Sequence, residues 1–329
     1  MADDVLVVDN SILSSVAKCP TQAFINYGLG LKTRAESLAM AAGSAIHLGL
    51  ARWLSGAATK EALDVCAGAY EKSVTRYLRK VELPRLGASD RRFEPEWIEG
   101  IFWQYLTRYE DNFPFKVVAE TMEHPIQAPF PVTVPSGKEV VYVARLDAIV
   151  RKWESGGKWS MDHKTTKKVS EWWIEKEKIS SQFSGQMWLG KQGVLQQDWD
   201  LQGVIVNAIE VPEPHRSEKV CPTHKESYQK CSVRHAGGTF VYIQRGEREM
   251  EAWLHTAKKL TRQYDRLLTL AREEGAAAID RVRMDGRFNG SCTFCEEREW
   301  CRLGRNVGKN AMRSMFIEEW WDPRVGQEA

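Results

Sequence analysis

The chain has 329 residues, of which 43% are hydrophobic and 27% are charged, values that are ordinary for a globular protein. Its formal net charge of +2 excludes any argument from overall charge for nucleic-acid binding, because domains with that function are often strongly basic. The first residues, MADDVLVVDN, lack the basic and apolar regions of a secretory signal. Apolar runs long enough to span a membrane, roughly 18 residues, are also missing, so we expect a cytoplasmic protein.

The first third of the sequence shows the spacing of apolar residues that is typical of helices. Four segments carry this spacing: residues 11–27, 36–54, 59–80 and 95–111. A Leu-Pro pair follows the third segment and a Phe-Pro pair follows the fourth, and each is expected to stop helix formation. We therefore predict a helical region over residues 1–112.

After Pro114 the pattern changes to the alternation that is typical of strands. Residues 115–134, 138–153 and 158–166 are predicted to form an antiparallel meander, with a Ser-Gly-Gly turn before the third segment. Residues 171–197 and 247–274 are predicted to be helical, and residues 201–211 and 239–245 to be strands. These elements predict an α/β core with helical ends.

The predicted elements divide the chain into three regions that we expect to form one integrated domain. The helical region over 1–112 is followed by a sheet core over 113–246, in which residues 212–238 form an inserted polar loop. Residues 247–329 hold the C-terminal helix and a cluster of cysteines.

The cysteines indicate a metal site. Seven cysteines in a chain with no export signal argue against a disulfide framework. Cys292, Cys295 and Cys301 follow a C-x2-C-x5-C pattern, and three thiols in one loop require a fourth ligand, for which Cys19 is the best candidate. Four thiolates suit zinc or an iron–sulfur cluster, and the spacing alone does not decide between them.

The remaining cysteines give weaker signals. Cys221 and Cys231 lie in the inserted loop with three histidines, but a C-x9-C spacing with scattered histidines is a weak zinc pattern. The three histidines are His215, His224 and His235. Cys66 lies in a helical pattern and is predicted to be a buried apolar residue.

Two acids and a lysine form a candidate catalytic set. Asp147 lies in the apolar segment VVYVARLDAIV, where an acid is costly unless something binds it. Asp162 and Lys164 are two residues apart in the next predicted strand, so their side chains share a face, whereas His163 points the other way and is expected to pack. Two carboxylates beside a lysine suit a divalent cation, and the alternative is a surface ion pair.

Four sequence motifs resemble those of the PD-(D/E)XK nuclease superfamily and occur in the same order. One cysteine precedes them in the chain and three cysteines follow them. The motifs are GSAIH (43–47), LD (146–147), DHK (162–164) and QFSGQ (182–186). More closely, they resemble the RecB-like branch that carries an iron–sulfur cluster, which includes AddB-type helicase–nucleases, CRISPR-associated exonucleases and phage relatives. The implied fold is a restriction-endonuclease-like core: a central mixed sheet flanked by helices, with helical ends joined by a metal cluster.

The resemblance implies a metal-dependent DNA exonuclease. His47, Asp147 and Asp162 would bind Mg²⁺ or Mn²⁺, and Lys164 would assist the attack of water on a phosphodiester. A 4Fe–4S cluster, with zinc as the alternative, would be held by four cysteines: Cys19, Cys292, Cys295 and Cys301. The expected partners are single-stranded DNA or duplex ends and a helicase, recombinase or integrase. The alternative is a non-catalytic DNA-binding or partner-binding module with the same fold.

Three further positions follow from the resemblance. Gly43 would let its helix approach the sheet closely, and Glu123 lies where relatives often carry an acid. The family's Q-x-x-x-Y helix is matched by Gln182, with Gln186 in place of the tyrosine, although Gln186 itself can be the motif glutamine with the frame shifted by one turn. A glutamine amide can still bond a phosphate or water. Separately, the adjacent tryptophans at 172 and 173 are candidates for stacking on the bases of a single strand, with helix packing as the commoner alternative.

Overall fold

The computed structural model describes most of the chain, namely residues 4–33, 38–80, 94–118, 125–152, 156–192, 201–212, 220–221, 225–227, 238–282, 290–295, 297–298, 301 and 316–324. Glu123 and most of the inserted loop at 212–238 lie outside these residues. Within them, no helix has the length and apolar character needed to cross a membrane.

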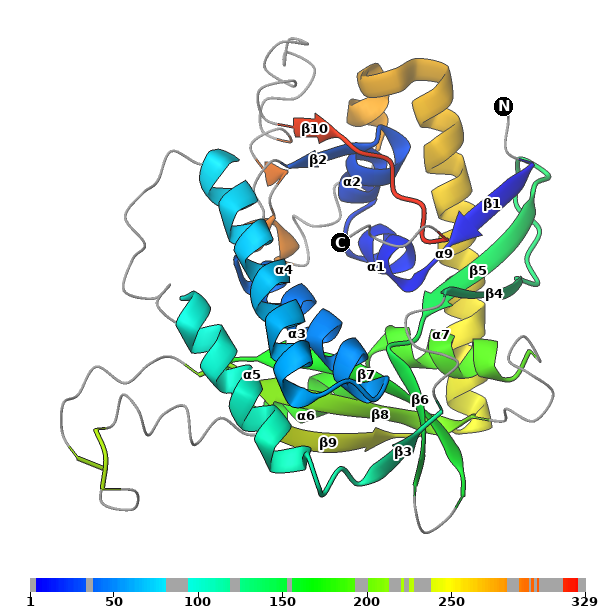
Figure 1. The fold of residues 1–329 in the computed structure, drawn as a ribbon. Helices are drawn as coiled ribbons and strands as arrows, with labels where there is room; N and C mark the ends of the chain where they lie inside the picture. Colours follow the sequence, from blue (N-terminus) through cyan, green and yellow to red (C-terminus); the bar gives the residue numbers. More distant parts are fainter. Residues whose placement is uncertain are drawn as a thin grey trace.

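A five-stranded mixed sheet forms the centre of the fold (Figure 1). Its strands lie in the order β3 (Phe115–Val117), β6 (Ala148–Lys152), β7 (Lys158–Thr166), β8 (Leu201–Glu210) and β9 (Gly238–Ile243). Neighbouring strands are antiparallel except β7 and β8, which are parallel. The predicted mixed sheet is confirmed. Strands β3, β6 and β7 form an antiparallel meander as expected, but the predicted segment 115–134 gives it only Phe115–Val117, because Pro125–Pro129 pairs in a second sheet.

A second sheet joins the N-terminus to the middle of the chain. It has three strands in the order β1 (Val5–Val8), β5 (Glu139–Arg145) and β4 (Pro125–Pro129), with β1 parallel to β5. The prediction of an entirely helical first third is therefore wrong at residues 5–8, and also at residues 31–33, which form a short strand in another sheet. The reason is that Leu6 and Val8 are buried while their neighbours are less so, the period-two pattern of a strand with one packed face.

The single strand predicted over 138–153 is divided into two by the structure. Strand β5 ends at Arg145 and pairs in the three-stranded sheet, whereas β6 begins at Ala148 and pairs in the five-stranded sheet. The chain thus changes sheets at Leu146 and Asp147. Period-two alternation continues across this point, which is why the sequence pattern alone does not reveal the break.

Helices pack on both faces of the central sheet, and strand β8 shows how. Its Val204, Val206 and Ala208 pack with residues of α6 (Glu171–Lys178) and α7 (Ser181–Gly190). Ile209 packs instead with residues of the helices α3 (Leu38–Leu54), α4 (Thr59–Lys80) and α5 (Pro95–Tyr109). Side chains of a strand alternate between faces, so β8 is buried on both sides. The sheet therefore lies between two helical layers.

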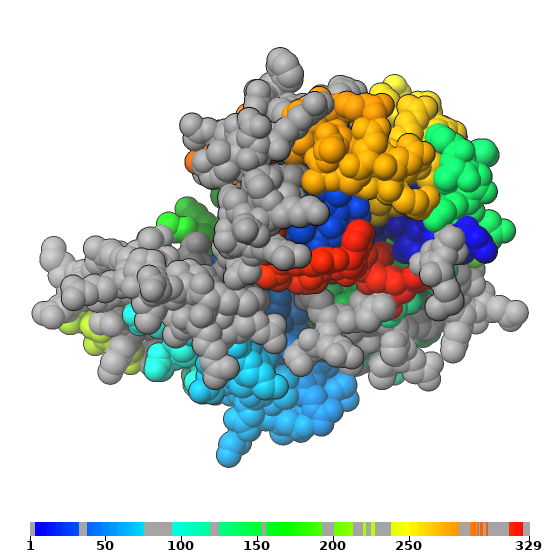
Figure 2. Space-filling view, turned by 90° about the horizontal axis from the view of Figure 1, so that it is seen from above, coloured from blue at the N-terminus to red at the C-terminus, as the bar shows by residue number. Residues whose placement is uncertain are grey.

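The N-terminal and C-terminal helical segments pack against each other. The N-terminal segment consists of α1 (Asn10–Lys18), α2 (Pro20–Ala23) and a π-helical turn over Phe24–Gly28. All three contact the long helix α9 (Glu247–Glu274), whose bounds agree with the prediction. Strand β2 (Leu31–Thr33) pairs with β10 (Phe316–Glu318), so the C-terminal strand lies along the N-terminal segment, as seen from above in Figure 2.

Candidate active site

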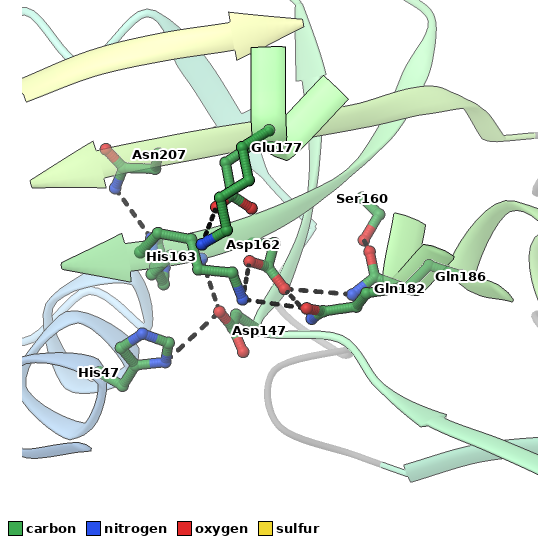
Figure 3. Close-up of polar contacts among 11 residues, drawn as sticks. His47, Asp147, Ser160, Asp162, His163, Glu177, Gln182, Gln186 and Asn207 are labelled. Carbon is green, nitrogen blue, oxygen red and sulfur yellow. Dashed lines mark hydrogen bonds and ion pairs between the residues drawn. The ribbon is translucent and has the colours of Figure 1, made fainter. Parts of the chain in front are cut away.

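The structure brings the predicted catalytic residues together around β7, the middle strand of the central sheet (Figure 3). His47 comes from α3, and Asp147 lies where the chain passes from β5 to β6. Asp162 and Lys164 lie on β7, and Gln182 lies in the first turn of α7. Residues separated by more than 100 positions in the sequence therefore meet in one site.

Asp147 is held by two neighbours. Its Oδ2 accepts a hydrogen bond from the backbone amide of His163 over 2.7 Å, and it lies 3.4 Å from Nδ1 of His47. The bond is possible because the chain leaves β5 just before Asp147, which directs the carboxylate toward the neighbouring strand β7. The break in the strand thus positions the first acid.

Asp162 is buried, and each of its carboxylate oxygens has partners. Its Oδ1 accepts hydrogen bonds from Nε2 of Gln182 at 2.6 Å and Nε2 of Gln186 at 3.2 Å. Its Oδ2 lies 2.7 Å from Nζ of Lys164. A buried carboxylate is costly unless it is paired and hydrogen-bonded, and here the two amides and the ammonium meet that need.

Lys164 is protonated at neutral pH. Its burial alone would lower its pKa, but the carboxylates of Asp162, Asp147 and Glu177 outweigh this effect and raise the pKa above the usual value. Nζ of Lys164 also donates a hydrogen bond to Oε1 of Gln182 over 3.2 Å. The site therefore presents a fixed positive charge beside two acids.

His163 is a buried neutral residue beneath the site, as expected from its alternation with the two motif residues. Burial, followed by the charge of His47, lowers its pKa to about 3. Its Nδ1 lies 2.8 Å from Nδ2 of Asn207, and its ring meets that of His47 edge-on with centroids 5.6 Å apart. Asn207 also donates to the hydroxyl of Tyr105 over 2.7 Å. A buried polar chain thus supports His47 from below.

Asn207 and Glu177 were missed by the sequence analysis. Asn207 has one available signal, a polar amide inside the apolar strand LQGVIVNAIEV, where it must find a partner. Glu177 is buried on α6 near Lys164 but gives no local signal, because glutamate is common in helices.

Gly43 fulfils the role predicted for it. A Cβ atom added at this position would lie 3.1 Å from Oγ1 of Thr165 on β7, which is tighter than most contacts of that kind. Helix α3 therefore approaches β7 closely at Gly43, one helical turn before His47.

The two glutamines of α7 both face Asp162. Gln186 has no solvent exposure, and its Oε1 accepts a hydrogen bond from Oγ of Ser160 over 3.2 Å. Gln182 is partly exposed and bridges Asp162 and Lys164. The residue in the tyrosine position thus holds the second acid from inside the protein, and Gln182 occupies the exposed position.

A family model described as the PD-(D/E)XK nuclease superfamily matches residues 10–302. The chain belongs to the PD-(D/E)XK nuclease superfamily. This superfamily consists generally of nucleases, hydrolases that bind DNA, cleave phosphodiester bonds and typically use Mg²⁺ or Mn²⁺. A comparison with curated proteins finds no match for the chain.

The chemistry of the donor groups, rather than their spacing in this structure, suits the divalent cation that this superfamily typically uses. Asp147, Asp162 and His47 carry the oxygen and imidazole donors that would bind it, and hydrogen bonds orient both carboxylates. In the part of the chain that the structure describes, no three histidines, cysteines or acids are gathered closely enough to hold a metal ion together. The ammonium of Lys164, close to Oδ2 of Asp162, balances the charge of that acid.

The predicted cluster cysteines lie near the contact between the two chain ends. Cys19 is buried between α1 and α2, and Cys292, Cys295 and Cys301 are partly exposed. The buried Glu297 connects Cys295 to α2: its Oε2 accepts hydrogen bonds from Nε2 of Gln22 at 2.9 Å and from the Cys295 thiol at 3.2 Å. The cysteine loop is therefore attached to α2, three residues beyond Cys19.

The remaining predictions have mixed outcomes. Cys66 is buried in α4 as expected, and burial raises its pKa to about 12. Cys221 is also buried, but Cys231 and the three histidines of the inserted loop lie outside the described residues. Trp173 is buried in the protein core, whereas Trp172 is 73% exposed, so only Trp172 can contact a base.

Proposed function

We propose that the protein is a Mg²⁺- or Mn²⁺-dependent DNA nuclease with Asp147, Asp162 and Lys164 at its centre. The observation that carries this proposal is the convergence of two hydrogen-bonded carboxylates and a charged lysine around strand β7. These contacts lie within a chain that belongs to a superfamily of nucleases. His47 completes the proposed set of metal ligands through its contact with Asp147.

The protein residues have separate tasks in this proposal. Asp147, Asp162 and His47 would hold the cation, which when bound lowers the pKa of water and stabilises negative charge on phosphate. Lys164 places a positive charge where the phosphodiester gains negative charge during attack. Gln182 bonds both Lys164 and Asp162, and so fixes the distance between the cation-binding acid and the ammonium.

We further propose exonuclease action, in recombination, repair or CRISPR-type DNA processing, and a structural 4Fe–4S cluster held by Cys19, Cys292, Cys295 and Cys301. The order of the motifs and the C-x2-C-x5-C spacing support this part of the proposal. The hydrogen bond from Gln22 to Glu297 supports it independently, because it attaches the loop with three cysteines to the helix that follows the fourth.

One preparation tests both parts of this proposal. The protein would be purified without oxygen, its visible absorption recorded, and the same sample incubated with end-labelled single-stranded and duplex DNA in Mn²⁺ or EDTA. We expect a brown protein that degrades DNA only with the metal, and an inactive Asp162→Asn variant. Asp64→Asn, an exposed acid on α4, is the matched control and should remain active. Metal-independent cleavage, or full activity of Asp162→Asn, would contradict the proposed chemistry.

A further inference from the structure

A hollow of about 440 Å³ opens beside the active-site lysine. Lys164 and Gln182 form its wall toward the active site, and Lys176, Ser180 and Ser181 line the remainder from α6 and the start of α7. Ammonium and hydroxyl groups are the donors that proteins present to phosphate oxygens. Glu177 of α6, labelled in Figure 3, also lines the hollow, but its side chain is buried. Its carboxylate lies 3.7 Å from Nζ of Lys176.

The helical segment beside this hollow carries two exposed apolar side chains, each next in sequence to a residue that lines it. Trp172 is 73% exposed and Ile179 is 81% exposed. Trp172 is four residues before Lys176 and Ile179 is three residues after it. This spacing places all three on one face of the helical segment. The neighbouring Trp173 is buried and anchors α6 to the sheet, so the helix cannot rotate to bury Trp172 without removing Trp173 from the core.

Lys176 is the cation of this face that lines the hollow. It keeps 59% of its side chain exposed and lies 3.7 Å from the carboxylate of Glu177. Among the exposed acids of α6, Glu175 is paired with Lys178 at 2.7 Å, and Glu171 lies at the start of the helix. A flat aromatic ring beside an exposed lysine is the combination with which proteins bind single strands, because bases stack on the ring and phosphates pair with the cation.

We propose that Trp172, Lys176 and Ile179 bind a single-stranded stretch of the DNA, which continues through the hollow to Lys164. Trp172 stacks on a base, and Lys176 with the serine hydroxyls contacts the backbone. The substrate class is single-stranded because a base within a duplex is stacked and paired, and its face is not accessible to a side chain. The inference rests on the nuclease function proposed above, with which the hollow is continuous through Lys164 and Gln182.

Binding without cleavage is the first test. Fluorescein-labelled oligothymidine of about 15 nucleotides, near the upper end of single-strand site sizes, would be titrated with the protein in EDTA. Trp172→Ala should weaken binding about tenfold, in the range measured for loss of one base–aromatic stack, and Trp172→Phe should retain most of it. Trp103→Ala is the matched control, since Trp103 is a 46% exposed tryptophan on α5.

The second test separates this subsite from the catalytic centre. In Mn²⁺, Trp172→Ala should raise KM on the long strand about tenfold with little change in kcat, because the stack lies away from the bond that breaks. For substrates too short to reach from Lys164 to Trp172, the KM of Trp172→Ala should equal that of the wild type. If Trp172→Ala binds DNA more weakly than the wild type in EDTA, but the wild type does not cleave DNA in Mn²⁺, the result would support the subsite and contradict the nuclease function.

Unchanged oligothymidine binding by both Trp172→Ala and Lys176→Glu would overturn the subsite, whatever the cleavage results. The exposed face of α6 would then be assigned to a protein partner.

Discussion

The backbone amide of His163 donates a hydrogen bond to Oδ2 of Asp147 over 2.7 Å. The strand that carries Asp162 and Lys164 therefore also fixes the first acid, and one short segment of β7 orients three of the central groups. Because the donor is the backbone, substitutions of the His163 side chain can retain this bond. The side chain of His163 can thus be tested separately from the placement of the acids.

The buried neutral imidazole of His163 predicts acid sensitivity. Its pKa is lowered to about 3, with His47, Asp162 and Lys164 as its charged or titratable neighbours. The unfolded chain binds a proton near pH 6.5 while the folded protein does not, so stability is complete above that pH and falls as the pH decreases toward 3. The free energy of unfolding should drop by up to about 2 kcal/mol between pH 6.5 and 5.

Urea unfolding of wild type and His163→Gln at pH 7 and pH 5 measures this effect. The variant should be less stable at pH 7, since its contact with Asn207 changes, but it should lose less stability on acidification. Equal losses in the two proteins would show that His163 does not control this pH range.

Lys164→Ala is expected to separate folding from catalysis. The ammonium of Lys164 is placed to stabilise charge on the phosphodiester, and loss of one such group typically lowers kcat by about 10²–10³-fold. Circular dichroism and DNA binding in EDTA should change little, while the cleavage rate in Mn²⁺ should fall. Lys152→Ala, which removes a lysine of β6 that lies over the Tyr242 ring, is the control with retained activity. Comparable rate losses in both variants would indicate a general charge effect.

The two glutamines of α7 should respond differently to substitution. Gln186→Ala removes the buried amide that bonds both Ser160 and Asp162 and should cost about 1–3 kcal/mol in stability, although Asp162 keeps Gln182 and Lys164 as partners. Gln182→Ala removes a partly exposed side chain that bonds both Lys164 and Asp162. We therefore expect a large fall in the cleavage rate and a small fall in the melting temperature. Thermal unfolding and initial cleavage rates of the two variants would be measured together. The reverse pattern would show that Gln182 is the structural residue.

Gly185 is required by the packing of α7 on β5. A Cβ atom at this position would overlap the hydroxyl of the buried Tyr142, so Gly185→Ala should destabilise the protein by about 1–3 kcal/mol. Removing the hydroxyl in a Gly185→Ala, Tyr142→Phe double variant should restore part of this loss. Gly68→Ala on α4, where open space surrounds the glycine, should instead stabilise the helix by up to about 1 kcal/mol.

Cys295→Ala should abolish the brown colour expected of a cluster and give poorly soluble protein. The reason is that loss of one of four ligands would release the loop that Glu297 attaches to α2. Iron and sulfide analysis of anaerobically purified protein measures the outcome. Cys66→Ala removes a buried thiol far from the motif and should keep its colour. A soluble and fully active Cys295→Ala variant would contradict a structural cluster.

The sequence by itself predicted the long helices, most strands of the five-stranded sheet and the residues proposed for catalysis. Helix α9 has strong apolar periodicity, the helix containing His47 is a continuous run of small and apolar residues, and the acids stand out because they interrupt apolar strands. These signals are local, so they can be read from neighbouring residues. The cysteine spacing is local in the same sense.

Only the tertiary structure decided how these residues meet. The division of one apparent strand at Asp147 depends on pairing with two different sheets, which no neighbouring residue specifies. The same is true of β1, a short segment that becomes a strand because β5 lies beside it. Burial likewise separated Trp172 from Trp173 and Gln182 from Gln186, because each pair is alike in sequence and differs only in what packs against it.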